Sequence, residues 1–187
     1  MAIHRAAWLE RRYGAEIDWQ PFDLHPEYPP EGMPRSEQEG GFPEGFVDHY
    51  RSMIEAAGFP YHPPGVTPNS LLSLQLVELA RHRGCFAELH VLLFYSYWSL
   101  GRDIGDPEGL AEIGASVGLD KNEIRETLAD GRYRERIESS TQYARELGVD
   151  GVPAWLMDDR LLVIGAHPLE VFEQAMGRLG HEPVNGD

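Results

Sequence analysis

The spacing of hydrophobic positions divides the chain into helical, extended and irregular segments. A helical repeat of about 3.6 residues begins near the amino terminus, where Ile3, Ala6 and Leu9 share one side. The same repeat predicts a run of helices through the middle of the chain, over residues 46–57, 68–83, 86–100, 107–117, 121–130 and 132–147. A last helix follows Pro168.

Local signals set the ends of these helices. Thr67 and Pro68 resemble an N-cap followed by proline at the first helical position, and Gly84 ends that helix. Residues 86–100 are apolar around most of the helix circumference. We therefore expect this helix to be the buried centre of the helical region.

Extended segments flank the helical region. Apolar and polar residues alternate over 16–22, which predicts a short strand. Residues 154–157 and 161–164 are apolar and enclose a three-residue turn, which predicts a hairpin. Pro153 precedes the first of these strands, as expected for a residue that cannot donate a sheet hydrogen bond. An X-Pro bond also permits a cis peptide, so the bond between Val152 and Pro153 is a candidate for one.

A long segment after residue 22, rich in proline and glycine, predicts an irregular connection that runs to about residue 45. Loops of this length without secondary structure are often binding elements or lids. A surface loop without a function is the alternative, and the sequence leaves both open.

Composition narrows the classes of function. The 187 residues include 16 basic and 31 acidic residues, for a formal net charge of −15, which disfavours binding to nucleic acid or to an anionic membrane. No apolar run reaches the roughly 18 residues of a transmembrane helix, and the first residues do not resemble a signal peptide. We therefore expect a cytoplasmic protein.

Four stretches together carry a resemblance to a known family. They are Trp19-Gln20-Pro21-Phe22-Asp23-Leu24-His25-Pro26, Asn69-Ser70 before a Leu-rich helix, Leu93 to Trp98 leading into Gly101-Arg102-Asp103-Ile104, and Gly151-Val152-Pro153 before the hairpin. The chain resembles the DsbA-like thioredoxin-fold family, and within it the FrnE-type branch of dithiol oxidoreductases. The resemblance implies an α/β fold, with a thioredoxin-like domain over 1–45 and 149–187 and an all-helical insertion over 46–148.

The reactive motif of that family is missing from these residues. The sequence has one cysteine, Cys85, and no Cys-x-x-C, so no catalytic residue of the family is present and the first strand is absent. One interpretation is that the chain is shortened at its amino terminus, and the other is a redox-inactive relative. We favour the first, because deleting a central strand leaves buried backbone groups unpaired, at about 1–3 kcal/mol each.

The resemblance places a substrate-binding groove at Val152, Pro153, Phe22 and His25. The backbone of the loop at Val152 and Pro153 would pair with an extended substrate. His25 could tune a neighbouring thiol, although the family pattern commonly has asparagine there, and a surface polar role is the alternative. After Asn69-Ser70 the chain has Ser73-Leu74-Gln75 where relatives carry an Ala-His-Arg-like triplet, on a helix that the resemblance places along the groove.

Other candidate residues are expected to be inert. Cys85 lies between apolar neighbours near a helix start, which is typical of a core cysteine. The eight histidines do not show the spacing of a metal site, so we expect no metal.

The expected function is therefore thiol–disulfide exchange on a peptide or small-molecule substrate, without a cofactor, provided that the missing motif lies upstream. A glutathione-dependent enzyme similar to 2-hydroxychromene-2-carboxylate isomerases and kappa-class glutathione transferases is the first alternative. A redox-inactive binding module is the second. A homodimer is a further expectation.

Overall fold

The computed structural model describes residues 2–39 and 45–184, and contacts divide the chain into two compact units. One unit comprises Met1–Gln20 and Tyr143–Asp187, and the other comprises Pro21–Gln142. The expected domains place residues 21–45 with the thioredoxin-like part, whereas the contacts group these residues with the helices.

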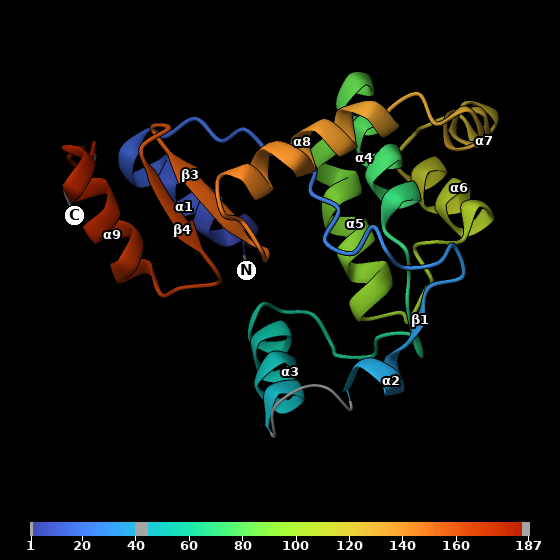
Figure 1. The fold of residues 1–187 in the computed structure, drawn as a ribbon. Helices are drawn as coiled ribbons and strands as arrows, with labels where there is room; N and C mark the ends of the chain where they lie inside the picture. The colour runs from blue at the N-terminus through green and yellow to red at the C-terminus, as the bar shows by residue number, and fades with distance from the viewer. Residues whose placement is uncertain (1, 40–44, 185–187) are drawn as a thin grey trace. The chain divides into compact units, whose positions relative to one another are not determined.

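The unit formed by Met1–Gln20 and Tyr143–Asp187 contains a β-hairpin and two helices (Figure 1). Strand β3 (Ala154–Met157) pairs antiparallel with β4 (Leu161–Ile164), as the sequence predicted. Helices α1 (Ala2–Tyr13) and α9 (Leu169–Leu179) supply the helical packing, and α8 (Arg134–Glu146) enters this unit with its last turn.

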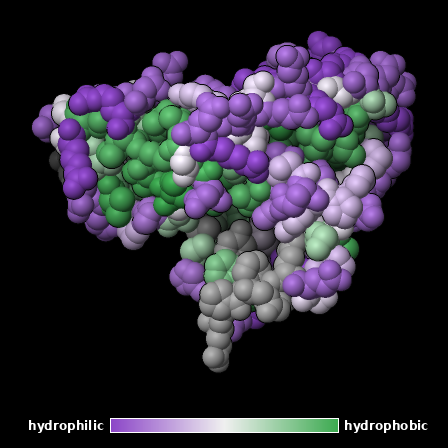
Figure 2. Space-filling model, in the orientation of Figure 1, coloured by the Kyte–Doolittle hydropathy of each residue, from purple (hydrophilic) through white to green (hydrophobic). Residues whose placement is uncertain are grey.

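One face of the hairpin is buried against α1 and α9. Met157 and the partly buried Trp155 pack with Leu9 of α1 and Phe172 of α9 in one hydrophobic cluster. The other face, which carries Leu156, remains partly exposed, and Figure 2 shows hydrophobic side chains gathered over the hairpin. This two-sided pattern follows from the alternation of side chains along each strand.

The strand predicted over residues 16–22 is wrong. These residues do alternate, since Ile17 and Trp19 are partly buried while Asp18 and Gln20 are exposed. The described residues place no neighbouring strand beside them, however, and an extended segment becomes a sheet strand only when its backbone groups find a partner. Trp19 instead contacts the ring of Trp155, with centroids 6.4 Å apart.

The unit formed by Pro21–Gln142 is mainly helical. Its described elements are β1 (Met33–Pro34), α2 (Arg35–Glu39), α3 (Phe46–Ala56), β2 (Val66–Thr67), α4 (Leu71–Arg83), α5 (Phe86–Trp98), α6 (Pro107–Ser116), α7 (Lys121–Asp130) and most of α8. β1 and β2 pair in a short antiparallel ribbon. The segment over 23–39 is thus less irregular than predicted, and residues 40–44 of the predicted connection lie outside the described residues.

Helix α4 begins later than predicted. Thr67 pairs with Met33 in the ribbon, so it cannot act as the N-cap, and Ser70 holds that position instead. The side chain of Asn69 accepts a hydrogen bond from the Leu71 N–H at 3.0 Å, which satisfies one of the free donors of the first turn.

The centre of this unit is α4, so the prediction for residues 86–100 is wrong. Leu76 and Leu79 of α4 are completely or almost completely buried and pack with Leu110 of α6 and Ile124 of α7. Helix α5 buries Leu89 and Leu93 but leaves one side exposed, at Val91, Phe94 and Tyr95.

Candidate substrate-binding loop

The loop over residues 150–153 connects the end of α8 to β3. Gly148 ends the helix with a φ of 88°, a backbone conformation that glycine adopts without steric cost. Val149 then buries its side chain, and its N–H donates to the Ala144 carbonyl at 3.0 Å. The Val152–Pro153 peptide bond is cis. The contacts of Val149 thus anchor the loop where it leaves the helix.

The hairpin pairing reaches one residue into this loop. The Pro153 carbonyl accepts a hydrogen bond from the Gly165 N–H at 2.7 Å, which extends the hairpin by one pair. Within the part of the chain that the structure describes, the backbone N–H and C=O groups of Gly151 and Val152 have no protein partner. The Val152 side chain is 54% exposed. The loop therefore offers free donors and acceptors beside the first residue of a strand.

A side chain from α1 fixes the neighbouring connection between β4 and α9. The Nε of Arg5 donates to the His167 carbonyl at 2.6 Å, and its Nη2 donates to the Ala166 carbonyl at 3.3 Å. The arginine thereby ties the start of α1 to the loop that follows the hairpin. This role was not predicted from the sequence. The available signal was an arginine in the first turn of a helix, where the helix dipole disfavours a cation.

Phe22 and His25 belong to the unit formed by Pro21–Gln142, whereas Val152 and Pro153 belong to the other unit. Phe22 is partly buried. The His25 ring stacks on Tyr28 with centroids 4.4 Å apart, and its Nδ1 lies 2.9 Å from a carboxylate oxygen of Glu27. His25 is therefore engaged by its own loop, which fits the alternative of a surface polar residue.

Polar contacts hold the loop around His25 in place. Asp23 is buried, its backbone N–H donates to the Thr141 hydroxyl at 2.9 Å, and one of its carboxylate oxygens accepts from Ser70 at 3.1 Å. The Asn69 side-chain amide donates to the Tyr28 carbonyl at 2.7 Å. The Asn69-Ser70 pair, noted in the sequence only for its resemblance, thus anchors this loop to α4.

The helix turn after Asn69-Ser70 faces inward. Gln75 is 0% exposed and Ser73 is also buried. A completely buried side chain cannot contact a substrate in a surface groove. Gln75 therefore belongs to the interior of the helical unit.

Cys85 has the properties of an unreactive thiol. It occupies the N-cap position of α5 and is partly buried. Burial raises the pKa of the Cys85 thiol, and the nearby Glu88 carboxylate raises it further. A raised pKa leaves little thiolate at neutral pH, and the thiolate is the nucleophilic form.

The described residues contain neither a cluster suited to a metal ion nor a membrane-spanning helix. Over 2–39 and 45–184, no group of three or more His, Cys, Asp or Glu side chains is placed to hold a metal ion. Among the helices in these same ranges, none has both the length and the apolar character to cross a membrane.

The fold of this chain is similar to those of known proteins. A probable DsbA oxidoreductase from Streptomyces coelicolor superposes with a TM-score of 0.78 at 28% identity, over 89% of this chain and 76% of that one. A 2-hydroxychromene-2-carboxylate isomerase superposes with a TM-score of 0.67 at 24% identity, over 96% of this chain and 88% of that one. The uncharacterized protein YwbO of Bacillus subtilis is 24% identical over 93% of this chain and 88% of its own length.

The fold class expected from the sequence is confirmed as a thioredoxin-like α/β fold with a large helical part. Residues 1–177 match the family described as the DSBA-like thioredoxin domain. The match spans nearly the whole sequence. The chain therefore belongs to the DSBA-like thioredoxin domain family.

Proposed function

We propose that this protein binds an extended thiol or disulfide substrate, a peptide or a small molecule, along the loop over residues 150–153 and acts in thiol–disulfide exchange. The observation that carries the proposal is the pair of unpartnered backbone units at Gly151 and Val152, next to the start of β3. Membership of the DSBA-like family and the 28% identity to a probable DsbA oxidoreductase support the same chemistry.

Backbone pairing suits a protein that accepts many substrates. A peptide that lies beside Gly151 and Val152 would gain main-chain hydrogen bonds as an added strand does, and these bonds do not depend on the peptide's side chains. The exposed Val152 side chain would contribute apolar contact. We assign substrate binding and orientation to this loop.

The exchange step itself needs sulfur atoms in two roles. An attacking thiolate forms a mixed disulfide with the substrate, and a second thiol then displaces it, so that the substrate disulfide is reduced while the protein dithiol is oxidised. The single cysteine of this sequence, Cys85, lies in the helical unit with a raised pKa. We therefore assign neither sulfur role to any of these 187 residues.

Glutathione is the second ligand that we propose for this loop, under the alternative of a glutathione-dependent isomerase. Its peptide backbone could pair with Gly151 and Val152 in the same way as a longer substrate. This alternative differs from the first in the source of the reactive thiol, which glutathione itself would supply. Binding of reduced glutathione in the micromolar range favours it, and oxidised glutathione or a disulfide-linked peptide binding more tightly favours exchange.

A pair of loop variants tests the proposed binding mode. Val152→Pro removes the backbone N–H at the loop tip, whereas Val152→Ala shortens the side chain and keeps the N–H. One lost hydrogen bond corresponds to roughly a tenfold weaker affinity. We expect calorimetric titration with a disulfide-linked peptide to show this loss for Val152→Pro and a much smaller one for Val152→Ala. Equal affinities of the two variants would argue against backbone pairing.

A second measurement separates binding from exchange. The intact mass and the insulin-reduction activity of the protein isolated from its host are compared with those of the 187-residue chain. If the isolated protein reduces insulin and the 187-residue chain does not, the result supports exchange with sulfur atoms outside these residues. Peptide binding without activity in either sample supports the redox-inactive module.

Location and assembly are two further proposals. We propose a cytoplasmic protein, supported by the single cysteine, because disulfides persist mainly in oxidising compartments and these residues can form no intrachain disulfide. Fractionation of the host cell tests this location. We also propose a homodimer, which light scattering on the eluting protein checks.

A further inference from the structure

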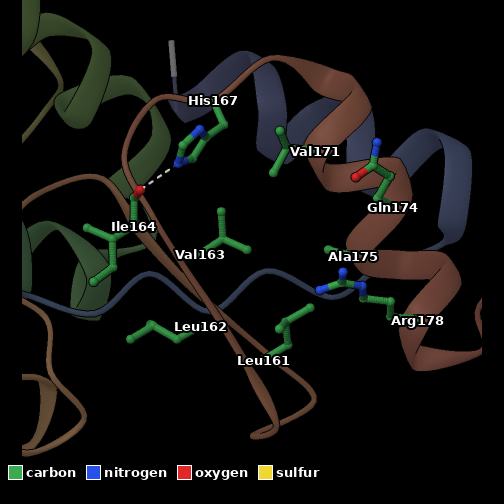
Figure 3. Close-up of a pocket in the computed structure, with 9 residues that line it drawn as sticks. All are labelled: Leu161, Leu162, Val163, Ile164, His167, Val171, Gln174, Ala175 and Arg178. Atoms are coloured by element: carbon green, nitrogen blue, oxygen red, sulfur yellow. Dashed lines mark hydrogen bonds between the residues drawn. The ribbon is translucent and has the colours of Figure 1, made fainter.

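A cavity of about 270 Å³ lies between β4 and α9, within the unit formed by Met1–Gln20 and Tyr143–Asp187 (Figure 3). Figure 3 shows Leu161 and Val163 pointing from the strand toward the helix, and the side chain of Arg178 reaching back toward the strand. The helix contributes Val171 and Ala175 to the opposite wall. Six of the nine lining residues are aliphatic, and the other three, among them the exposed Arg178, are polar.

The outer edge of β4 borders this cavity. Because the Gly165 N–H bonds to Pro153, the backbone groups of Leu161 and Val163 face β3, and those of Leu162 and Ile164 face away from it. The Ile164 carbonyl is 2.8 Å from Nε2 of His167. A carbonyl only accepts, so the His167 ring donates this bond and satisfies part of the open edge.

The charge on the cavity wall differs from that of the whole chain. The protein has nearly twice as many acidic as basic residues, yet the lining contains Arg178 and no aspartate or glutamate. Arg178 has no carboxylate partner among residues 2–39 and 45–184. On the opposite side of the helix, Glu173 lies 3.7 Å from Arg12 of α1. A guanidinium without a carboxylate favours an anionic ligand, and a carboxylate can take two of its hydrogen bonds.

We propose that this cavity binds an aliphatic carboxylate of medium chain length. The carboxylate binds Arg178, and the aliphatic chain lies between the strand side chains Leu161 and Val163 and the helix side chains Val171 and Ala175. From residue 178 to residue 171 the helix rises about 10 Å, which suits octanoate or decanoate. This binding site is separate from the loop over 150–153 and does not depend on its function.

The proposal predicts a specific order of affinities for the full chain. Each methylene removed from water favours binding by about fourfold, so decanoate, with two more methylenes, binds up to about fifteenfold more tightly than octanoate. Decanol has the same chain without the charge and binds at least about tenfold more weakly than decanoate. Calorimetric titration below the micelle concentration of each compound measures these affinities, and methyl shifts of Leu161, Val163 and Val171 locate the ligand.

A matched pair of variants tests the role of the cation. Arg178→Gln removes the charge at the cavity, and Arg160→Gln removes a charge from the exposed hairpin turn outside the lining. We expect Arg178→Gln to weaken decanoate about tenfold and to leave decanol unchanged, with no effect from Arg160→Gln. Equal losses in both variants would overturn the proposal. Decylamine binding as tightly as decanoate, or methyl shifts confined to other residues, would overturn it as well.

Discussion

At the scale of single residues, the helical unit contains a buried carboxylate with two cations. Glu78 is 1% exposed, and its two carboxylate oxygens lie 3.4 Å from Nε of Arg81 and 2.8 Å from Nε of Arg136. The second contact joins α8 to α4. A buried charge is tolerated only while its partners remain, because its desolvation is otherwise uncompensated.

Removal of Arg136 should therefore destabilise the protein. We expect Arg136→Gln to lower the free energy of unfolding by about 2–3 kcal/mol, since Glu78 keeps only the longer contact to Arg81. The double variant Glu78→Gln with Arg136→Gln should recover at least about 1 kcal/mol, which urea denaturation measures. Arg134→Gln, on the same helix, is the control. An effect of Arg134→Gln as large as that of Arg136→Gln would contradict this account.

His90 should make stability depend on pH. It lies between the rings of Phe86 and Phe94, each 5.1 Å away between centroids. Burial, and secondarily the charge of Arg81, lowers the pKa of His90 from 6.5 to about 4. The unfolded chain then takes up a proton from about pH 6.5 downward, whereas the folded protein resists until about pH 4, so folding weakens as the pH falls through this window.

The variant His90→Gln has no titratable group at this position, so it should not show this loss of stability as the pH falls. We expect the wild-type protein to lose, relative to His90→Gln, on the order of 2–3 kcal/mol of unfolding free energy between pH 7 and pH 4. Chemical denaturation at both pH values measures the difference. The exposed His49→Gln provides a comparison for the loss of a histidine in general. Parallel pH profiles for wild type and His90→Gln would be inconsistent with the lowered pKa.

At the scale of elements, two helix glycines have opposite surroundings. A Cβ added at Gly114 of α6 would lie 2.6 Å from the Cδ1 atom of Ile124 and 3.2 Å from that of Leu76. The absence of a side chain at Gly114 therefore allows α6 to pack closely against α7 and α4. A Cβ at Gly177 of α9 would have no atom within 4 Å.

The same substitution should have opposite effects at these two positions. Gly177→Ala should raise the melting temperature, because alanine favours a helix over glycine by about 0.8–1.0 kcal/mol. Gly114→Ala should lower it, because overpacking in a filled core costs about 1–3 kcal/mol, more than the gain in helix propensity. Thermal denaturation followed by circular dichroism compares the pair. A stabilised Gly114→Ala would show that α6 and α7 are packed more loosely than described.

The helix caps show what the sequence could predict for an element. Asp120 was not identified as a cap, although aspartate before a charged helix start is a common signal. Its carboxylate accepts hydrogen bonds from the N–H groups of Asn122 and Glu123, both at 2.9 Å. The element itself, residues 121–130, was predicted with its observed bounds.

Asp120 therefore provides a prediction at the start of α7. Asp120→Ala should cost about 1 kcal/mol of unfolding free energy, and Asp120→Asn should cost less because its side-chain oxygen still accepts. Urea denaturation of both variants measures this order. The capping role would be refuted if alanine and asparagine proved equivalent.

At the scale of the whole molecule, the sequence predicted most elements and the fold class. Helical spacing was sufficient for most helices, and the hairpin β3–β4 followed from two apolar runs around a turn. The strand expected at residues 16–22 shows the limit. The alternation of apolar and polar residues predicted correctly which side chains of residues 16–20 are at least partly buried. Whether the segment forms a strand depends on a neighbouring strand, which the sequence of the segment itself does not reveal.

The candidate site was predictable to a smaller extent. Pro153 was identified from its position before a strand, because proline lacks an N–H. The free backbone of Gly151, the anchoring role of Arg5 and the burial of Gln75 follow from contacts between distant residues. A cavity between β4 and α9 likewise requires the packed structure.

The central claim is that the loop over residues 150–153 pairs with its substrate through the backbone. Amide hydrogen exchange at Gly151 and Val152, measured by nuclear magnetic resonance with and without a disulfide-linked peptide, tests it most directly. The account predicts that the peptide slows exchange at one or both of these amides and shifts their resonances. Saturating peptide that leaves both amides unprotected, while other residues respond, would contradict it.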